Sequence, residues 1–417
     1  MAIGYACLAV GVPQSEMTHL SLSRVSDKSL YESCSANITH LGNLLRYTRD
    51  QELKLFRISS DLIPFGSSTA NTLRWWELFA HELSDLGLLA KQSGIRLSMH
   101  PGQYTVLNSP RMEVVDNAIA DLVYHTKVLT SMGLGTEHKI VLHIGGGYKD
   151  KAEATRRFKS TYQSLPQEVR ARLILENDDT TYTISEVLAI ARDLGCPAVF
   201  DNLHHACNPS EESMTEQQWI EACSSTWKEG DGKQKIHYSQ QDHTKRSGSH
   251  SPTIALDEFL TFYDALTDKT IDIMLEVKDK NVSALKCMHA TSGATREQLE
   301  EQWGKYRPLV TEREPAKVWE VKELIDAAEE SPGASTAFYR LLDEILTLEV
   351  TRSQAAITAK AMAEKCTRTS AEEKRIAKRI EEYQQAKISL PKLKQSILNI
   401  ANKHAVDEVL TSYYCMM

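Results

Sequence analysis

Eight short apolar runs, separated by longer stretches of helical pattern, dominate the first 290 residues and restrict the fold more than any other feature of the chain. The runs occupy residues 3–10, 54–59, 95–99, 139–143, 172–176, 198–201, 235–238 and 271–277. Regular alternation of strand and helix patterns is typical of βα units that build a parallel sheet. Eight is the number of strands that closes a (β/α)8 TIM barrel, so we predict an α/β barrel over residues 1–300. An open, doubly wound sheet is the alternative.

Two of the connecting segments show the helical pattern clearly. Residues 73–93 carry Leu83, Leu86 and Ala90 at helical spacing, and residues 112–132 follow the helix breaker Pro110. We therefore predict one helix over each segment.

The composition changes after residue 301, where Glu, Lys, Arg and Ala become frequent. A hinge is predicted at residues 331–333, and helices are predicted over residues 336–362, 371–385 and 392–404. No group of residues in this part suggests chemistry. Residues 301–417 therefore form, by prediction, a helical C-terminal region of unknown role, suited to packing or to contact with DNA or another protein.

Charge and cysteine content restrict the class of protein. The 48 Lys and Arg residues against 56 Asp and Glu residues give a net charge of −8, which disfavours a protein that coats nucleic acid through overall positive charge. The eight cysteines include no Cys-x-x-Cys pair, which fits reduced thiols. The chain has no basic leader before an apolar segment and no run of apolar residues long enough to span a bilayer. We expect a cytoplasmic protein without membrane contact, associated with the nucleoid in a prokaryote.

The carboxyl ends of the predicted strands, and the loops that follow them, carry residues that bind metals. In chain order they are His100, His143, Glu176, Asp201, His204, His237, His250 and Glu276. Barrel enzymes build their sites from these strand ends, so we expect the eight side chains to meet. Eight ligands are more than one four-coordinate metal ion needs, which favours a cluster of two or three metal ions. Mixed imidazole and carboxylate ligands suit zinc or manganese better than calcium.

Clusters of several metal ions recur in enzymes that hydrolyse phosphate esters, because the ions activate water and neutralise the phosphate. Hydrolysis of a phosphodiester is therefore the favoured reaction. A sugar isomerase or epimerase with one or two divalent ions is the rival interpretation, since such barrels also gather Glu, Asp and His at strand ends.

With these residues in view, the chain resembles the UV damage endonuclease family, whose fold is similar to the barrel of endonuclease IV. The resemblance covers about residues 1–290. It rests on residues 3–7 (IGYAC), 56–65 (FRISSDLIPF), 98–104 (SMHPGQY), 141–146 (VLHIGG), 175–179 (LENDD), 200–205 (FDNLHH) and 235–239 (KIHYS). Each string is modest alone, and their order makes the signature specific.

The resemblance implies an enzyme that nicks duplex DNA immediately 5′ of UV photolesions by metal-dependent phosphodiester hydrolysis. It identifies the eight residues above as metal ligands and assigns catalytic roles to Glu176, Glu276 and Lys235, a lysine that can be carboxylated in family members. It also matches Gln103 and Tyr104 to the pair that probes the DNA at the lesion, and we place Tyr5 with them. An aromatic ring beside an amide can replace lost stacking and hydrogen bonds in a distorted duplex. The expected cofactor is a cluster of two or three manganese ions, with magnesium or zinc as alternatives and no nucleotide cofactor.

Two positions depart from the family pattern. Ser68 stands where the family usually supplies a histidine ligand, and a hydroxyl is a poor replacement for imidazole. Ala9 stands where members can carry an asparagine that probes DNA. These departures leave a non-catalytic protein that binds damaged DNA as a further alternative.

The negative net charge requires a local basic surface if DNA is the partner. Loops after the strands that carry ligands hold Lys149, Lys151, Arg156, Arg157, Lys245, Arg246, Lys278 and Lys280. We expect these cations to form a basic rim around the metal site. The acidic excess is then expected on the helices of the barrel and on the C-terminal region.

Overall fold

The computed structural model describes residues 1–331 and 333–416, so position 332 of the predicted hinge lies outside the described residues. The chain divides into two compact units, and each is treated separately below. The barrel unit comprises Met1–Ala9, Gln14–Ile254 and Phe262–Ala284, and the helical unit comprises Val10–Pro13, Ala255–Thr261 and the chain from Leu285 onward.

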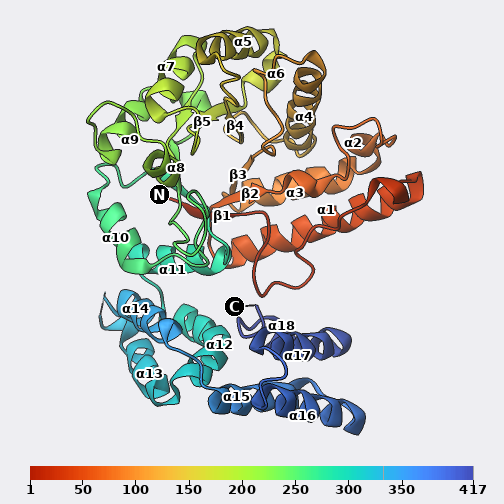
Figure 1. Ribbon diagram of the computed structural model, residues 1–417, viewed down its shortest axis with the longest axis vertical. Helices are drawn as coiled ribbons and strands as arrows, with labels where there is room; N and C mark the ends of the chain where they lie inside the picture. Colours follow the sequence, from red (N-terminus) through yellow and green to blue (C-terminus); the bar gives the residue numbers. More distant parts are fainter. Residues whose placement is uncertain (332, 417) are drawn as a thin grey trace. The chain divides into compact units, whose positions relative to one another are not determined.

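Eight parallel strands form the centre of the barrel unit (Figure 1). They are β1 (Ile3–Ala6), β2 (Leu55–Ile58), β3 (Arg96–Met99), β4 (Lys139–His143), β5 (Leu173–Glu176), β6 (Ala198–Val199), β7 (Lys235–Tyr238) and β8 (Asp272–Leu275). The strands pair in the order β6-β5-β4-β3-β2-β1-β8-β7, and a parallel bridge between Asp201 and His237 joins the two ends of this series. The prediction of a TIM barrel is confirmed, and the open sheet is excluded.

The first strand is shorter than its apolar run. Cys7 follows β1 with a left-handed φ of 74°, which turns the chain out of the sheet before residue 10. Within β1, Gly4 lies so close to β2 that an added Cβ would sit 2.2 Å from the carbonyl oxygen of Leu55. A glycine is therefore required where these two strands pair.

Helices connect the strands of the barrel unit and pack around them (Figure 1). They are α1 (Asp27–Asp50), α2 (Trp75–Leu78), α3 (Ala80–Gln92), α4 (Met112–Ser131), α5 (Lys151–Ser164), α6 (Gln167–Arg170), α7 (Ile184–Leu194), α8 (Asn202–Cys207) and α9 (Glu216–Ser224). The helices α10 (Leu256–Ala265) and α11 (Asn281–Ser292) contribute residues to both units.

The prediction for residues 112–132 is confirmed by α4, but the single helix predicted over residues 73–93 is wrong. This segment forms α2 and α3, and the chain leaves helical geometry at Phe79, where φ is −116° and ψ is 26°. Phe79 is buried, so packing of its ring offsets the local break in the helix.

The helical unit is built from α12 (Arg296–Arg313), α13 (Val318–Asp326), α14 (Ala334–Thr347), α15 (Arg352–Cys366), α16 (Ser370–Gln384), α17 (Leu390–His404) and α18 (Asp407–Leu410). The helix predicted over residues 336–362 is two helices, because the chain leaves α14 and Thr351 caps the start of α15 by accepting a hydrogen bond from the Gln354 amide. The other two predicted helices are confirmed by α16 and α17.

Two further observations concern the whole described chain. No helix in residues 1–331 or 333–416 is long and apolar enough to cross a membrane. All eight cysteines are free thiols, as the sequence predicts.

Candidate metal centre

The barrel brings all eight predicted ligands together at the carboxyl ends of its strands. His143, Glu176 and His237 lie within β4, β5 and β7, and His204 lies within α8, whereas the other four follow the end of a strand or lie in the loop after it. Two groups have ligand atoms within 4.8 Å of one another: His100, His143 and Glu176, and Glu176 with Asp201, His237 and Glu276. Glu176 belongs to both groups and is therefore the centre of the arrangement.

The first group pairs two imidazoles with one oxygen of Glu176. His100 Nε2 lies 2.9 Å and His143 Nε2 lies 3.4 Å from Glu176 Oε2. The other ring nitrogen of His100 lies 3.1 Å from the carbonyl oxygen of Pro101, which fixes the orientation of that ring. Two imidazoles and a carboxylate are a ligand set that suits zinc or manganese.

The second group surrounds the other oxygen of Glu176. His237 Nδ1 is hydrogen-bonded to Glu176 Oε1 and lies 3.2 Å from Glu276 Oε1. Asp201 follows β6 and caps α8 by accepting a hydrogen bond of 2.8 Å from the His204 amide. Three carboxylates and one imidazole thus converge in a region where Glu176, Asp201 and His237 are fully buried.

His204 and His250 lie at the margin of the second group. His204 Nδ1 is 3.8 Å from Asp201 Oδ1 and 3.9 Å from Glu176 Oε1, and it is also 2.9 Å from the carbonyl oxygen of Asn177. His250 Nε2 is 3.7 Å from Glu276 Oε2. Both side chains are within reach of the cluster, and their assignment as metal ligands stays a prediction.

The electrostatics of the site favour a bound cation. Burial raises the pKa of Asp201 to about 7, with Glu176 and Glu276 adding to the rise and His204 opposing it. Burial also raises the pKa of Glu176, but His237, His143 and His100 outweigh it, so this pKa lies well below its ordinary value. A cation among these carboxylates would relieve the repulsion between them.

Two buried polar atoms support the same conclusion. His143 Nδ1 and Asp201 Oδ2 find no hydrogen-bond partner among the described residues. An unpaired polar atom in such a setting costs about 1–3 kcal/mol. The residues present therefore fit a divalent cation in both donor atoms and charge.

Arg57, at the end of β2, is a member of the site that the sequence did not single out. Its Nη1 lies 2.7 Å from Glu276 Oε1, and its Nη2 lies 2.8 Å from His237 Nε2. Burial would lower its pKa, but the carboxylates of Glu276 and Glu176 raise it, so the guanidinium remains charged. Arg57 thus holds two predicted ligands in place from the side of β2.

Lys235 begins β7, two residues before His237, and is only 2% exposed. Burial lowers its pKa well below the ordinary lysine value, and the charges of Arg96 and Arg57 lower it further. Lys235 is therefore an interior residue of the barrel rather than a cation available to solvent.

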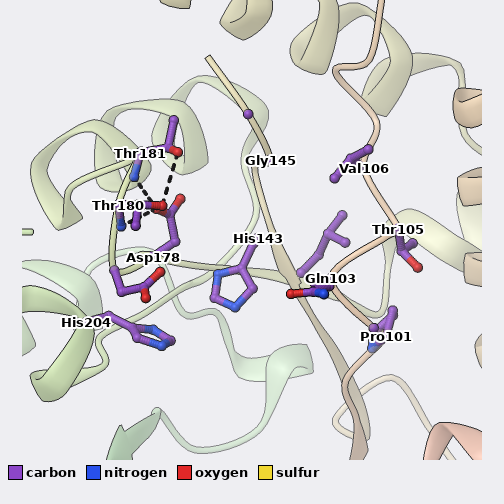
Figure 2. Close-up of a pocket in the computed structure, with 14 residues that line it drawn as sticks. Pro101, Gln103, Thr105, Val106, His143, Gly145, Asp178, Thr180, Thr181 and His204 are labelled. Carbon is purple, nitrogen blue, oxygen red and sulfur yellow. Dashed lines mark hydrogen bonds between the residues drawn. The ribbon is translucent and has the colours of Figure 1, made fainter. Parts of the chain in front are cut away.

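A cavity of about 350 Å³ opens beside the first ligand group (Figure 2). Its lining includes His143, His204 and Gln103, with Asp178 on the loop after β5. The Asp178 carboxylate accepts hydrogen bonds from three successive backbone amides, those of residues 180 to 182, and so fixes this loop. The predicted probing residue Gln103 therefore lies at an opening that also contains two of the predicted ligands.

Comparison with known proteins shows which family the chain belongs to. A family model described as UV-endonuclease UvdE matches residues 2–301. A UV DNA damage endonuclease of Clostridium perfringens is 38% identical over 309 residues, which cover 72% of this chain and 75% of that protein. The chain belongs to the UvdE family. A UV DNA damage endonuclease of Bacillus cereus is 32% identical over 302 residues, covering 70% of this chain and 95% of the relative. The crystal structure of SacUVDE has a TM-score of 0.65 at 37% identity, and the match covers 69% of this chain and 96% of that one.

Within the UvdE barrel, the predicted DNA-probing residues differ in exposure. Tyr104 is 82% exposed on the loop after β3, so its ring is free to meet a substrate. Tyr5 is fully buried, its hydroxyl lies 2.8 Å from Thr48 Oγ1 on α1, and its ring packs edge-on against Phe56. The prediction for Tyr5 is wrong, because this side chain of β1 points outward into the helix layer.

The two departures from the family pattern also have defined places in the structure. Ser68 lies exposed on a turn after β2, where its hydroxyl accepts a hydrogen bond of 3.2 Å from the Ala70 amide. Ala9 is buried, and its carbonyl oxygen accepts a hydrogen bond from Ser15 Oγ. Neither side chain replaces the group expected from the resemblance.

Five of the eight cations predicted for a basic rim at the mouth of the UvdE barrel form ion pairs, but they share only three carboxylates, so most of the positive charge of the rim remains. Ion pairs join Lys151 to Glu186, and both Lys245 and Lys278 to Asp242. Arg156 and Arg157 both pair with Glu153. Among the described residues, this leaves three predicted rim cations without an ion pair: Lys149, Arg246 and Lys280.

Proposed function

We propose that the protein is a metal-dependent endonuclease that nicks duplex DNA immediately 5′ of UV photolesions. Convergence of six predicted ligands in two groups that share Glu176 is the observation that carries this proposal, and membership of the UvdE family supports it. The relatives from Clostridium perfringens and Bacillus cereus are both UV DNA damage endonucleases, which supports damaged DNA as the substrate.

In this proposal the two ligand groups around Glu176 would each hold one divalent ion, and His204 and His250 would hold a third ion or support the second group. Bound ions of this kind activate water and stabilise the charge that develops on a phosphodiester during hydrolysis. Glu176 would contribute one oxygen to each group, and Glu276 would contribute to the second group from the end of β8. Arg57 supplies positive charge next to Glu276 and His237, and Lys235 assists from the start of β7, two residues before His237.

The ligand chemistry favours manganese, with magnesium and zinc as alternatives. Imidazole nitrogens are common ligands of manganese and zinc, whereas magnesium binds chiefly oxygen. The first group contains two imidazoles and one carboxylate. Magnesium is therefore expected to bind this group more weakly than manganese or zinc.

Recognition of the lesion is assigned to the loop after β3 and the cavity beside it. The exposed ring of Tyr104 can stack on a base next to the lesion, and the Gln103 amide can hydrogen-bond to a base edge. The cavity of about 350 Å³ is large enough to receive an unstacked base close to His143 and His204.

Nicking of supercoiled plasmid tests the proposal. Protein loaded with Mn²⁺ should relax UV-irradiated plasmid and leave unirradiated plasmid intact, and EDTA should stop the reaction. His143→Ala should abolish nicking and reduce the metal content measured by mass spectrometry, whereas His81→Ala serves as the matched control because His81 is exposed on α3. Equal nicking of both plasmids, or full activity of the His143 variant, would refute the proposal.

A further inference from the structure

Residues 301–417 contain 18 Lys and Arg residues and 18 Asp and Glu residues, so the C-terminal region does not carry the acidic excess expected there. Within this region, positive charge is concentrated in the last part of the chain. Residues 352–417 contain 12 Lys and Arg residues against 7 Asp and Glu residues, a net charge of +5. Residues 1–351 contain 36 against 49, a net charge of −13. The segment from α15 onward is thus a basic part of an otherwise acidic protein, and the UvdE family model ends before it, at residue 301.

Almost all of this positive charge faces solvent. Eleven of the 12 cations are exposed, and the exception is Lys394, which is buried against Glu312 at 2.8 Å. Three of the exposed cations form ion pairs: Lys365 with Glu408, Lys403 with Glu372, and Arg379 with Glu382. These pairs also use three of the seven carboxylates of the segment. The exposed positive charge is therefore only partly neutralised by the protein itself.

The middle of α16 carries the densest group of these cations. Lys374, Arg375, Lys378 and Arg379 are all exposed, and they form two pairs at a spacing of four residues. Residues with this spacing lie side by side on a helix, so the four cations form one band. The buried Ile376 lies between them in sequence and anchors the helix on its other face.

The helices packed against α16, and the connection that follows it, also carry exposed cations. Helix α16 packs against both α15 and α17 within the helical unit. Lys360 is exposed on α15, and Lys392 is exposed at the start of α17. Lys387 is exposed on the connection between α16 and α17. We call the four cations of α16 and these three further cations the basic surface.

We propose that the basic surface binds the phosphate backbone of duplex DNA without regard to sequence or damage. The inference rests on the proposed function, in which duplex DNA is the substrate. A net charge of −13 on the rest of the chain repels DNA, whereas a separate cationic surface attracts it and raises the rate of encounter. Binding of undamaged duplex would hold the enzyme on DNA while the barrel finds a lesion.

The test neutralises the band in the full-length protein. The band variant carries Lys374→Gln, Arg375→Gln, Lys378→Gln and Arg379→Gln, because glutamine has nearly the helix propensity of lysine and arginine. The control variant removes the same amount of positive charge from the barrel unit. Its four positions are exposed and lie near the C-terminal ends of barrel helices, opposite the metal site. The substitutions are Arg49→Gln, Lys91→Gln, Arg170→Gln and Arg192→Gln. Circular dichroism establishes that both variants fold.

Fluorescence anisotropy then measures the affinity for an undamaged 30-base-pair duplex between about 50 and 200 mM salt, a range over which binding to phosphates dominates. The slope of log affinity against log salt should become shallower by about 0.9 for each phosphate that the band variant no longer neutralises. The dissociation constant of the band variant should rise about tenfold at the lowest salt concentration. The control variant should bind like the wild type. Equal binding by all three proteins would overturn the inference.

A second measurement separates this inference from the proposed function. At saturating enzyme, the band variant should nick a short duplex with one photolesion at the wild-type rate, because its barrel is unchanged. If the wild type fails to nick, the proposed function fails, while the anisotropy result on undamaged DNA still decides the role of the basic surface. Tighter binding of poly-glutamate than of duplex DNA would also overturn the inference, in favour of an acidic protein partner.

Discussion

Replacement of Arg57 by glutamine tests how the metal-free site is held together. Arg57 and Glu276 form an ion pair of 2.7 Å with side-chain exposures of 7% and 12%. Removing one partner of such a buried pair leaves the other charge uncompensated and costs about 3–5 kcal/mol. We expect the EDTA-treated Arg57→Gln variant to lose stability in this range at pH 7.

The loss should depend on pH through Glu276. Burial raises the pKa of Glu276, but Arg57 and His237 lower it by more, so the pKa lies well below its ordinary value. A carboxyl with a lowered pKa stabilises the fold above its unfolded pKa of about 4.3, and this contribution is lost as the pH falls toward the folded value. The stability difference between wild type and variant should therefore be full at neutral pH and shrink below about pH 4.

The matched control is Arg96→Gln. Arg96 begins β3 and pairs with Asp272, at the start of β8, at 2.9 Å with exposures of 14% and 7%. This ion pair lies at the opposite ends of the strands from the metal site, so its removal should destabilise the fold without any link to metal.

Urea denaturation with and without Mn²⁺ provides the readout. Mn²⁺ should stabilise Arg57→Gln more than wild type, because the ion supplies positive charge next to Glu276 that the variant lacks. It should stabilise Arg96→Gln and wild type equally. An equal gain for all three proteins, or a loss of stability below about 1 kcal/mol in Arg57→Gln, would refute the account of Arg57.

Three further substitutions test other parts of the site. Glu176→Gln should leave the circular dichroism spectrum unchanged but reduce bound metal and nicking by at least about 100-fold, because even residues that only orient metal ligands contribute about 10–100-fold. Retained metal in mass spectrometry would contradict the central place of this carboxylate. Tyr104→Ala should weaken binding to lesion-containing duplex by about 1–3 kcal/mol in anisotropy, which is the range expected for one base stacked on an aromatic ring. The same substitution should change the free energy of unfolding by less than about 0.5 kcal/mol, because the side chain is exposed. Ser68→His should raise the number of bound ions or their affinity in calorimetry, because it restores an imidazole; no change in either would show that the turn after β2 lies too far from the ions.

The eight strands and the gathering of His, Glu and Asp side chains at their carboxyl ends could be predicted from the sequence because both depend on local patterns. Each buried parallel strand is a continuous apolar run, and the residue at its carboxyl end must face the mouth of a barrel. His143 at the end of β4 and Glu176 at the end of β5 follow this rule. The breaks at Phe79 and before Thr351 could not be predicted, because they depend on which side chains find space in the core.

The errors at Tyr5 and Arg57 have one physical cause. A strand buried on both faces shows no alternation of polar and apolar residues, so its sequence does not tell which side chains point inward. Tyr5 of β1 points toward α1, whereas Arg57 of β2 points toward the ligands. Arg57 belongs to the site because it forms an ion pair with Glu276, which follows β8. These two residues lie far apart in the sequence and meet only in the closed barrel.

Cleavage of a 5′-labelled duplex that contains one UV photolesion tests the central claim most directly. With Mn²⁺, the account predicts a single product that ends at the phosphodiester immediately 5′ of the lesion, absent from the undamaged duplex and from reactions with EDTA. Cleavage at other positions, equal cleavage of undamaged duplex, or full activity of the EDTA-treated protein would contradict the account.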